Sequence, residues 1–187
     1  TLYAYLENGE LSLAKTGLSD SFLASLERIY IVACGSAYHA GMTAKYVFEQ
    51  LGHIPVEVEV ASEFRYRNPI LNTNSLVIII SQSGETADSL AALCLAKERT
   101  VPVLGIVNVP GSSIARESDY VMYTHAGPEI SVATTKAYSA QLIALYLLAI
   151  QIGVANNVIE KGVAGMLLLE LDLIPEKISQ ILDQKEQ

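Results

Sequence analysis

Five short runs of aliphatic and β-branched residues alternate with longer stretches of helical pattern along this sequence. The runs cover residues 29–33, 56–60, 76–80, 103–107 and 120–123. Each run has the length of one strand, and the segments between them are long enough to hold crossover helices. The alternation predicts a doubly wound α/β fold, with a parallel sheet of about five strands and helices on both faces.

The composition of two runs predicts where they lie in that sheet. Residues 76–80 are continuously apolar, which is typical of a central strand covered on both faces. Residues 56–60 alternate valine with glutamate, which favours a position nearer an edge. We expect helices over roughly residues 38–51, 87–97 and 135–152, with Gly153 as the stop signal of the last. Together these elements predict a three-layer sandwich of the flavodoxin or Rossmann type.

Both ends of the chain differ in pattern from its middle. Residues 1–27 carry a loose apolar pattern, and residues 19–21 resemble the cap of a short helix that ends near Glu27. Residues 160–187 are helical in pattern, with an interruption at Pro175. We therefore predict an N-terminal helical extension over 1–27, a central domain over 28–153 and a C-terminal helix over 154–187. We expect both ends to continue into a longer polypeptide.

Charge and hydropathy argue against two classes of partner. The formal net charge of −8 disfavours a nucleic-acid surface, because such surfaces neutralise phosphates with lysine and arginine. The longest unbroken apolar run, residues 142–150, is shorter than the ~20 residues of a membrane-spanning helix. We expect a protein that binds neither nucleic acid nor membrane.

The two cysteines, Cys34 and Cys94, form no CxxC pair and have no histidine cluster nearby. This pattern suggests neither a disulfide framework nor a zinc site. We expect reduced thiols, a cytoplasmic location, and no metal or cofactor.

A cluster of hydroxyls follows the most apolar run, at the point where the strand gives way to a helix. Ser81, Ser83 and Thr86 can each donate a hydrogen bond, Gln82 offers an amide, and Gly84 permits a tight turn. A helix N-terminus just beyond adds unpaired N–H groups and the positive end of its dipole. The cluster predicts an anion site without a lysine; the alternative is that these residues only turn the chain and cap the helix.

The first strand is followed by a similar junction, in which Gly35 and Ser36 open a helix. We expect both residues to contribute to ligand binding. The spacing from Gly35 to Gly41 does not fit the G-x-G-x-x-G fingerprint, which disfavours a dinucleotide. Cys34 is either a nucleophile at a helix N-terminus or, as we favour, a small buried residue at a strand end.

Two further segments carry polar groups whose role the sequence leaves open. In residues 127–136, Thr134 or Thr135 is a candidate N-cap, and Val132 with its neighbours could present backbone amides to a sugar hydroxyl. Residues 61–67 hold two arginines and two aromatic residues, suited to a partner subunit, an acidic ligand or simply a solvated turn.

Several of these motifs occur in an order that resembles a known family. They are residues 33–41, 61–67, 81–86, 108–113 and 129–136. They closely resemble the first sugar-isomerase (SIS) domain of the glucosamine-6-phosphate synthases, the glutamine–fructose-6-phosphate aminotransferases. The resemblance runs from about residue 28 to 152.

The resemblance implies a parent enzyme that makes glucosamine 6-phosphate and glutamate from fructose 6-phosphate and glutamine. It implies that the phosphate is held by Ser81, Gln82, Ser83 and Thr86. It further implies that Ser36 replaces a threonine beside the sugar, and that Val132 and Thr134 line the sugar side. Members of the family commonly have serine where this chain has Ala37, so one phosphate hydroxyl is missing, at a cost of about 1 kcal/mol.

The family's catalytic lysine, glutamate and histidine belong to a second SIS domain, and we find no equivalent constellation in this chain. Glu85 and Lys136 are the nearest titratable groups. We therefore expect a module that binds fructose 6-phosphate or glucosamine 6-phosphate without turning it over, with no catalytic residue of its own. Its expected partners are a second copy in a homodimer, and the glutaminase and second SIS domains of the parent.

Two other functions compete with this interpretation. One is a stand-alone regulatory SIS module that senses a phosphosugar. The other is a single-domain phosphosugar isomerase that completes its site by oligomerising.

Overall fold

The structure of the chain, a computed structural model, describes residues 1–131 and 134–184. Its centre is a five-stranded parallel sheet in the order β4-β3-β5-β6-β7. The strands are β3 (Arg28–Ala33), β4 (Val56–Val60), β5 (Ser75–Ser81), β6 (Val103–Val107) and β7 (Tyr120–Tyr123). Each predicted strand is confirmed to within one residue at either end. As predicted, β5 is central and β4 lies at an edge.

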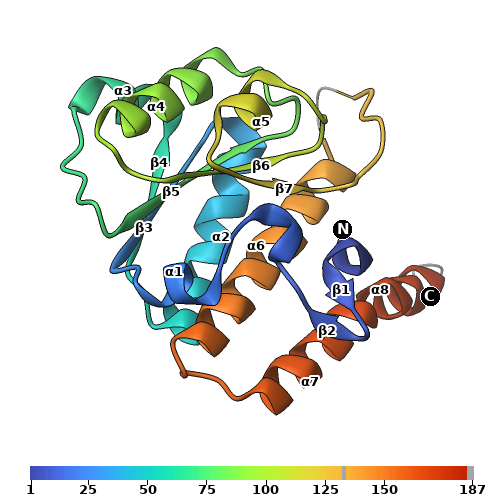
Figure 1. Cartoon of the computed structure of the whole chain (residues 1–187). Helices are drawn as coiled ribbons and strands as arrows, with labels where there is room; N and C mark the ends of the chain where they lie inside the picture. The colour runs from blue at the N-terminus through green and yellow to red at the C-terminus, as the bar shows by residue number, and fades with distance from the viewer. Residues whose placement is uncertain (132–133, 185–187) are drawn as a thin grey trace.

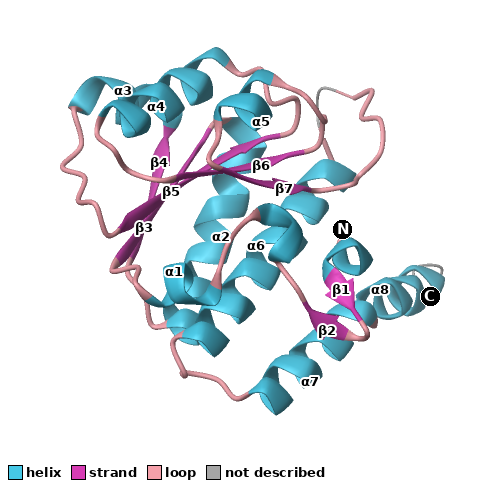
Figure 2. Ribbon diagram, in the orientation of Figure 1, coloured by secondary structure: helices cyan, strands magenta, loops and turns pink. Residues whose placement is uncertain are grey.

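Helices cover both faces of the sheet, which confirms the predicted doubly wound α/β fold (Figures 1 and 2). One face carries α1 (Asp20–Ala24), α2 (Gly35–Gly52) and α6 (Lys136–Ala155). The other face carries α3 (Ala61–Arg67), α4 (Ala87–Glu98) and α5 (Ser113–Glu117). The result is a three-layer sandwich.

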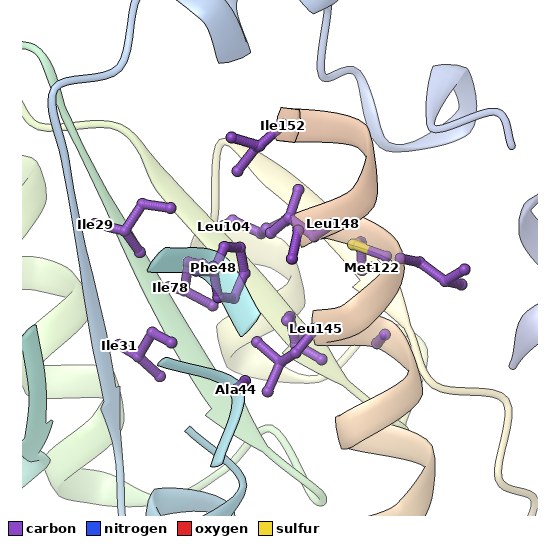
Figure 3. Close-up of a cluster of buried hydrophobic side chains, with 14 of the residues drawn as sticks. Ile29, Ile31, Ala44, Phe48, Ile78, Leu104, Met122, Leu145, Leu148 and Ile152 are labelled. Carbon is purple, nitrogen blue, oxygen red and sulfur yellow. The ribbon is translucent and has the colours of Figure 1, made fainter. Parts of the chain in front are cut away.

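Alternate side chains of each strand enter two different hydrophobic cores. Ile31 and Ile78 point toward α2 and α6, where they meet Phe48 and Leu145 (Figure 3). The neighbouring residues of the same strands, such as Ile79, pack against α3, α4 and α5 in the second core. Because successive side chains of a strand point to opposite faces, a strand buried on both sides must be apolar throughout. This explains the unbroken apolar run of β5.

The segments before β3 and after α6 lie near one another beside α6 (Figure 1). The first contains η1 (Leu2–Tyr5), the β1 (Leu6–Glu7) and β2 (Glu10–Leu11) hairpin, and η2 (Ala14–Thr16). The second contains α7 (Lys161–Asp172) and α8 (Ile174–Asp183), with Pro175 in the first turn of α8. Proline is tolerated there because first-turn N–H groups have no helical partner. The interruption expected at Pro175 is thus confirmed, whereas the three domain limits stay predictions.

Ser19 caps α1, as predicted from the sequence. Its hydroxyl accepts a hydrogen bond from the Phe22 amide at 3.2 Å. The helix ends at Ala24, three residues before the expected end at Glu27.

Gly153 lies inside α6, so the prediction that it stops this helix was wrong. A Cβ atom at this position would lie 2.5 Å from the carbonyl oxygen of Leu51 in α2. The glycine therefore serves the close approach of two packed helices, a requirement that depends on tertiary structure rather than on local helix signals.

Among the residues that the structure describes, α6 is the one helix long and apolar enough to cross a membrane, with a mean hydropathy of 1.6. However, 61% of that stretch is buried inside the domain. The apolar composition of α6 is that of a core helix, which packs against α2 beneath the sheet (Figure 1).

Candidate functional site

A cavity of about 150 Å³ lies where the strand order diverges, at the carboxyl ends of β3 and β5. From β3 the chain passes to β4 on one side, while β5 lies on the other, and such switch points are where open α/β sheets bind ligands. The cavity is lined by Cys34, Ser36, Ala37, Ile80, Ser81, Gln82, Ser83, Thr86 and Gln141. Five of the eight predicted binding residues therefore meet here.

The loop after β5, residues 81–86, holds its own hydroxyls in a defined arrangement. Ser81 Oγ accepts a hydrogen bond from the Gly84 amide at 3.0 Å and lies 3.0 Å from Thr86 Oγ1. Ser83 Oγ accepts from the Glu85 amide at 3.2 Å. Each hydroxyl has one hydrogen, and the Ser81–Thr86 pair consumes one of its two. Two O–H donors, one from this pair and one from Ser83, remain for a ligand.

Two helices begin at the cavity, α2 after Cys34 and α4 after Thr86, and neither N-cap side chain bonds to its helix. The first-turn N–H groups of a helix have no intrahelical partner, and they carry the positive end of the helix dipole. None of the nine residues lining the cavity is charged. The local field therefore favours an anion, although the chain as a whole is acidic.

Gly84 is in the left-handed region, with φ +68°, and packs directly against Ser112 in the segment that follows β6. Its carbonyl oxygen accepts a hydrogen bond from Ile114 N at 3.0 Å. Two residues earlier, the Gln82 carbonyl accepts from Asn108 N at 3.1 Å. The loop is thus tied at two points to the neighbouring strand–helix junction.

The Glu85 carboxylate is engaged outside the cavity. Its Oε1 accepts a hydrogen bond from Ser113 N, the first amide of α5, at 2.7 Å. This hydrogen bonding to Ser113, helped by the charge of Arg116, lowers the pKa of Glu85 below its usual value. Glu85 therefore positions the loop as a carboxylate and does not line the cavity.

Asn108 links this loop to the segment after β7. Its Oδ1 accepts from Thr124 Oγ1 at 3.0 Å and from Ala126 N at 2.8 Å. Its Nδ2 donates to the Gly127 carbonyl at 2.8 Å. One side chain thus organises the start of the segment that leads to Thr134.

The three other predicted binding residues lie around the cavity or outside the described part of the chain. Gly35, with φ +57°, stands between two lining residues at the start of α2. Thr134 precedes Thr135, the N-cap position of α6, and its Oγ1 is buried without a partner among the described residues. Val132 lies outside the described residues. The binding roles of all eight residues stay predictions.

Gln141 was missed by the sequence reasoning. It reaches the cavity from α6 and is only 2% exposed. The signal was its spacing, because it falls on the same helical stripe as Ala137 and Ala144, which are buried in the core. A polar residue on an apolar stripe indicates a buried polar role.

Residues 61–67, whose arginines left several roles open, form α3 and make ion pairs within the chain. Arg67 pairs with Glu59 and lies 3.6 Å from Glu57, both on the edge strand β4. Arg65 lies 3.6 Å from Asp88 at the start of α4. These contacts anchor α3 between β4 and α4.

A protein-family model described as "SIS domain" matches residues 22–151, which is most of the chain. The chain belongs to the SIS domain family. The matched region contains β3 to β7 and every residue that lines the cavity.

This SIS domain is 50% identical over 181 residues to glutamine–fructose-6-phosphate aminotransferase [isomerizing] of Caldanaerobacter subterraneus subsp. tengcongensis. That match covers 97% of this chain and 30% of the relative. The enzyme of the same name from Clostridium tetani is 49% identical over 177 residues, with 95% and 29% covered. The SIS domain thus spans about 30% of the length of these curated relatives, and the resemblance found in the sequence is confirmed.

Solved structures show a similarity to the same group of enzymes. The C-terminal domain of glucosamine-fructose-6-phosphate aminotransferase from Francisella tularensis superposes with a TM-score of 0.87 at 42% identity, covering 91% of this chain and 48% of that one. Glucosamine-6-phosphate deaminase from Thermotoga maritima superposes with a TM-score of 0.71 at 27% identity, covering 94% and 50%. The fold of the SIS domain is therefore shared with proteins named for phosphorylated amino sugars.

Proposed function

We propose that this SIS domain binds a sugar phosphate, with the phosphate held at residues 81–86. The observation that carries the proposal is the convergence of two uncapped helix N-termini and the two free O–H donors of residues 81–86 on one uncharged cavity. Backbone amides at helix N-termini are a general means of binding phosphate without a lysine. The cavity of about 150 Å³ holds a phosphate and part of a sugar, so the rest of the ligand extends from its mouth.

The sugar phosphate that we propose is fructose 6-phosphate or glucosamine 6-phosphate. The support is the similarity to aminotransferases whose names include fructose 6-phosphate. We propose that the domain is the substrate-binding module of such an enzyme, which makes glucosamine 6-phosphate from fructose 6-phosphate and glutamine. Its partners are then a glutaminase domain and a second SIS domain of the same enzyme.

The proposed role is binding rather than turnover. Of the two titratable candidates near the site, Glu85 accepts the amide of Ser113, and Lys136 Nζ donates to the Pro128 carbonyl. Isomerisation needs an acid and a base within hydrogen-bond reach of the sugar carbons. Both candidates already have partners within the chain, which favours catalytic groups supplied by another domain.

A cytoplasmic homodimer completes the proposal. Cys34 and Cys94 are both free thiols, which fits a reducing compartment. On α3, the guanidinium of Arg65 lies 5.2 Å from the ring centre of the exposed Tyr66. Arginine and tyrosine are enriched at interfaces, so this pair supports a subunit contact there.

NMR titration of the ¹⁵N-labelled domain with fructose 6-phosphate tests the proposal. We expect the largest shifts at the amides of residues 35–38 and 81–88, because these line the cavity or begin its two helices. Inorganic phosphate should shift the same amides at higher concentration. Absence of shifts at millimolar ligand, or shifts confined to α7 and α8, would contradict binding at this cavity.

Incubation of the domain with fructose 6-phosphate distinguishes binding from isomerisation. Because no acid–base pair lines the cavity among the described residues, we expect no glucose 6-phosphate to form. Its formation would instead favour a single-domain isomerase.

A further inference from the structure

Gln141 presents a hydrogen-bond acceptor that nothing in the described chain satisfies. Its side chain lines the cavity from α6, yet its Oε1 is buried and has no donor among the described residues. Buried amide oxygens are nearly always paired, because an unpaired one forfeits its hydrogen bond to water. An unpaired acceptor of this kind at a binding cavity indicates that its hydrogen-bond donor belongs to the ligand.

The hydroxyls of the loop after β5 and the helix N-termini at the cavity can do the opposite and donate hydrogen bonds. The hydroxyls of Ser81, Ser83 and Thr86 and the two helix N-termini offer hydrogen-bond donors, which suit phosphate oxygens. A phosphate dianion carries acceptors only and cannot donate to the Gln141 oxygen. A sugar hydroxyl can. The residues that line the cavity therefore combine donors for a phosphate with the buried, unsatisfied acceptor of Gln141, which suits a hydroxyl.

We propose that Gln141 is a specificity-determining residue, whose side-chain amide accepts a hydrogen bond from a sugar hydroxyl of the bound phosphosugar. The inference rests on the proposed function and adds how the sugar is distinguished from other phosphate esters. A site that hydrogen-bonds a substrate hydroxyl rejects an analogue without it, because the buried acceptor is then left unpaired.

The neighbours of Gln141 fit this role. Ala37, at the start of α2, lines the same cavity, and Ala137 and Ala144 share the buried stripe of α6 with Gln141. These side chains carry no donor, so none of them can satisfy the amide.

The test compares Gln141→Met with the wild-type domain. Methionine is unbranched and of similar length, so it preserves volume while removing the acceptor. Two ligands are titrated by calorimetry: fructose 6-phosphate, and ethyl phosphate, which is a phosphate ester without a hydroxyl. Gln151→Met is the matched control, because Gln151 is on the same helix but outside this cavity, where it donates to Asp20 at 2.5 Å.

We expect Gln141→Met to lower the affinity for fructose 6-phosphate about fivefold to tenfold. Its affinity for ethyl phosphate should stay within about twofold of the wild-type value. The melting temperature should not fall, because removing an unsatisfied buried polar group does not destabilise a protein. An unchanged affinity for fructose 6-phosphate would overturn the proposal, as would an equal loss for both ligands, which indicates a phosphate contact.

A lower melting temperature with equal losses for both ligands would also overturn it, by showing that Gln141 is structural. Gln141→Leu repeats the test with a stiffer side chain if the methionine variant folds poorly. If the wild-type domain binds neither ligand, the proposed function fails instead, so the two failures are distinguishable.

Discussion

A Cβ atom built on Gly84 would lie 2.0 Å from Oγ of Ser112, closer than two such atoms can approach. Ser112 is buried, so it cannot move aside freely. The absence of a side chain at Gly84 therefore sets how closely the loop after β5 packs on the segment after β6. This contact fixes the shape of the cavity together with two backbone hydrogen bonds, from Ile114 N to Gly84 O and from Asn108 N to Gln82 O.

Gly84→Ala should lower the free energy of unfolding by about 2–4 kcal/mol, because it adds a clash to an unfavourable backbone angle. It should also abolish sugar-phosphate binding in the fraction that folds. Gly9→Ala is the control, since Gly9 has φ +82° but nothing within 4 Å of a built Cβ, so it should cost only about 1 kcal/mol. Urea unfolding measures both; equal losses for the two variants would show that the contact with Ser112 is unimportant.

Asn108→Ala should destabilise the domain by about 2–3 kcal/mol. The change removes three side-chain hydrogen bonds, to Thr124, Ala126 and Gly127, and leaves the buried Thr124 hydroxyl and the partly buried Ala126 amide without this partner. Asn74→Ala is a suitable control, because Asn74 makes one exposed bond to Glu27 and should cost less than about 1 kcal/mol. A loss at Asn108 no greater than that at Asn74 would refute the view that Asn108 organises the segment after β7.

Alanine at two helix glycines should have effects of opposite sign. In Gly153→Ala the new Cβ would lie 2.5 Å from Leu51 O, so we expect the free energy of unfolding to fall by about 2–3 kcal/mol. Gly165, in α7, has nothing within 4 Å, so Gly165→Ala should gain about 0.5–1 kcal/mol from helix propensity. Thermal unfolding of both variants checks the pair, and a gain at Gly153 would contradict the close approach of α6 to α2.

Stability should fall at high pH because of Tyr5. Burial raises its pKa to about 12, and its hydroxyl donates to Tyr123 O at 2.9 Å. The unfolded chain loses this proton near pH 10 and the folded protein only near 12, so the folded state becomes relatively less favourable as pH rises between these values. We expect a loss on the order of 1–2 kcal/mol. Urea unfolding at pH 9 and 11 checks this, because the free energy of unfolding should fall less between these values in Tyr5→Phe than in the wild type. An identical fall in both proteins would contradict the role of Tyr5.

The strands and the loop after β5 were predictable because their signals are local. An apolar run such as 76–80 needs two covering layers, and hydroxyls with a glycine after a strand indicate a turn into a helix N-terminus. The glutamates of 56–60 likewise placed β4 at an edge, where their side chains meet Arg67. Each of these predictions used only neighbours in the sequence.

The remaining features depend on residues far apart in the chain. Gly153 has the local signature of a helix stop, and only the position of Leu51 shows that it is a packing residue. Gln141 enters the cavity because α6 packs beneath the sheet, and the sequence gives no register for that packing. The packing role of Gly153 and the position of Gln141 are therefore both set by long-range contacts.

The central claim is that residues 81–86 hold the phosphate of a sugar phosphate. Calorimetric titration of fructose 6-phosphate into the wild-type domain and into Ser83→Ala/Thr86→Ala tests it most directly. The wild-type domain should bind, and Ser83→Ala/Thr86→Ala should lose detectable binding. The change removes the Ser83 donor, whose hydrogen bond to a charged phosphate contributes about 1.5–3 kcal/mol, and also the Thr86 hydroxyl that holds Ser81. Thr43→Ala/Ser139→Ala removes the same two hydroxyl types at exposed sites outside the cavity and should bind as the wild type does. Unchanged affinity in Ser83→Ala/Thr86→Ala would show that residues 81–86 only turn the chain into α4.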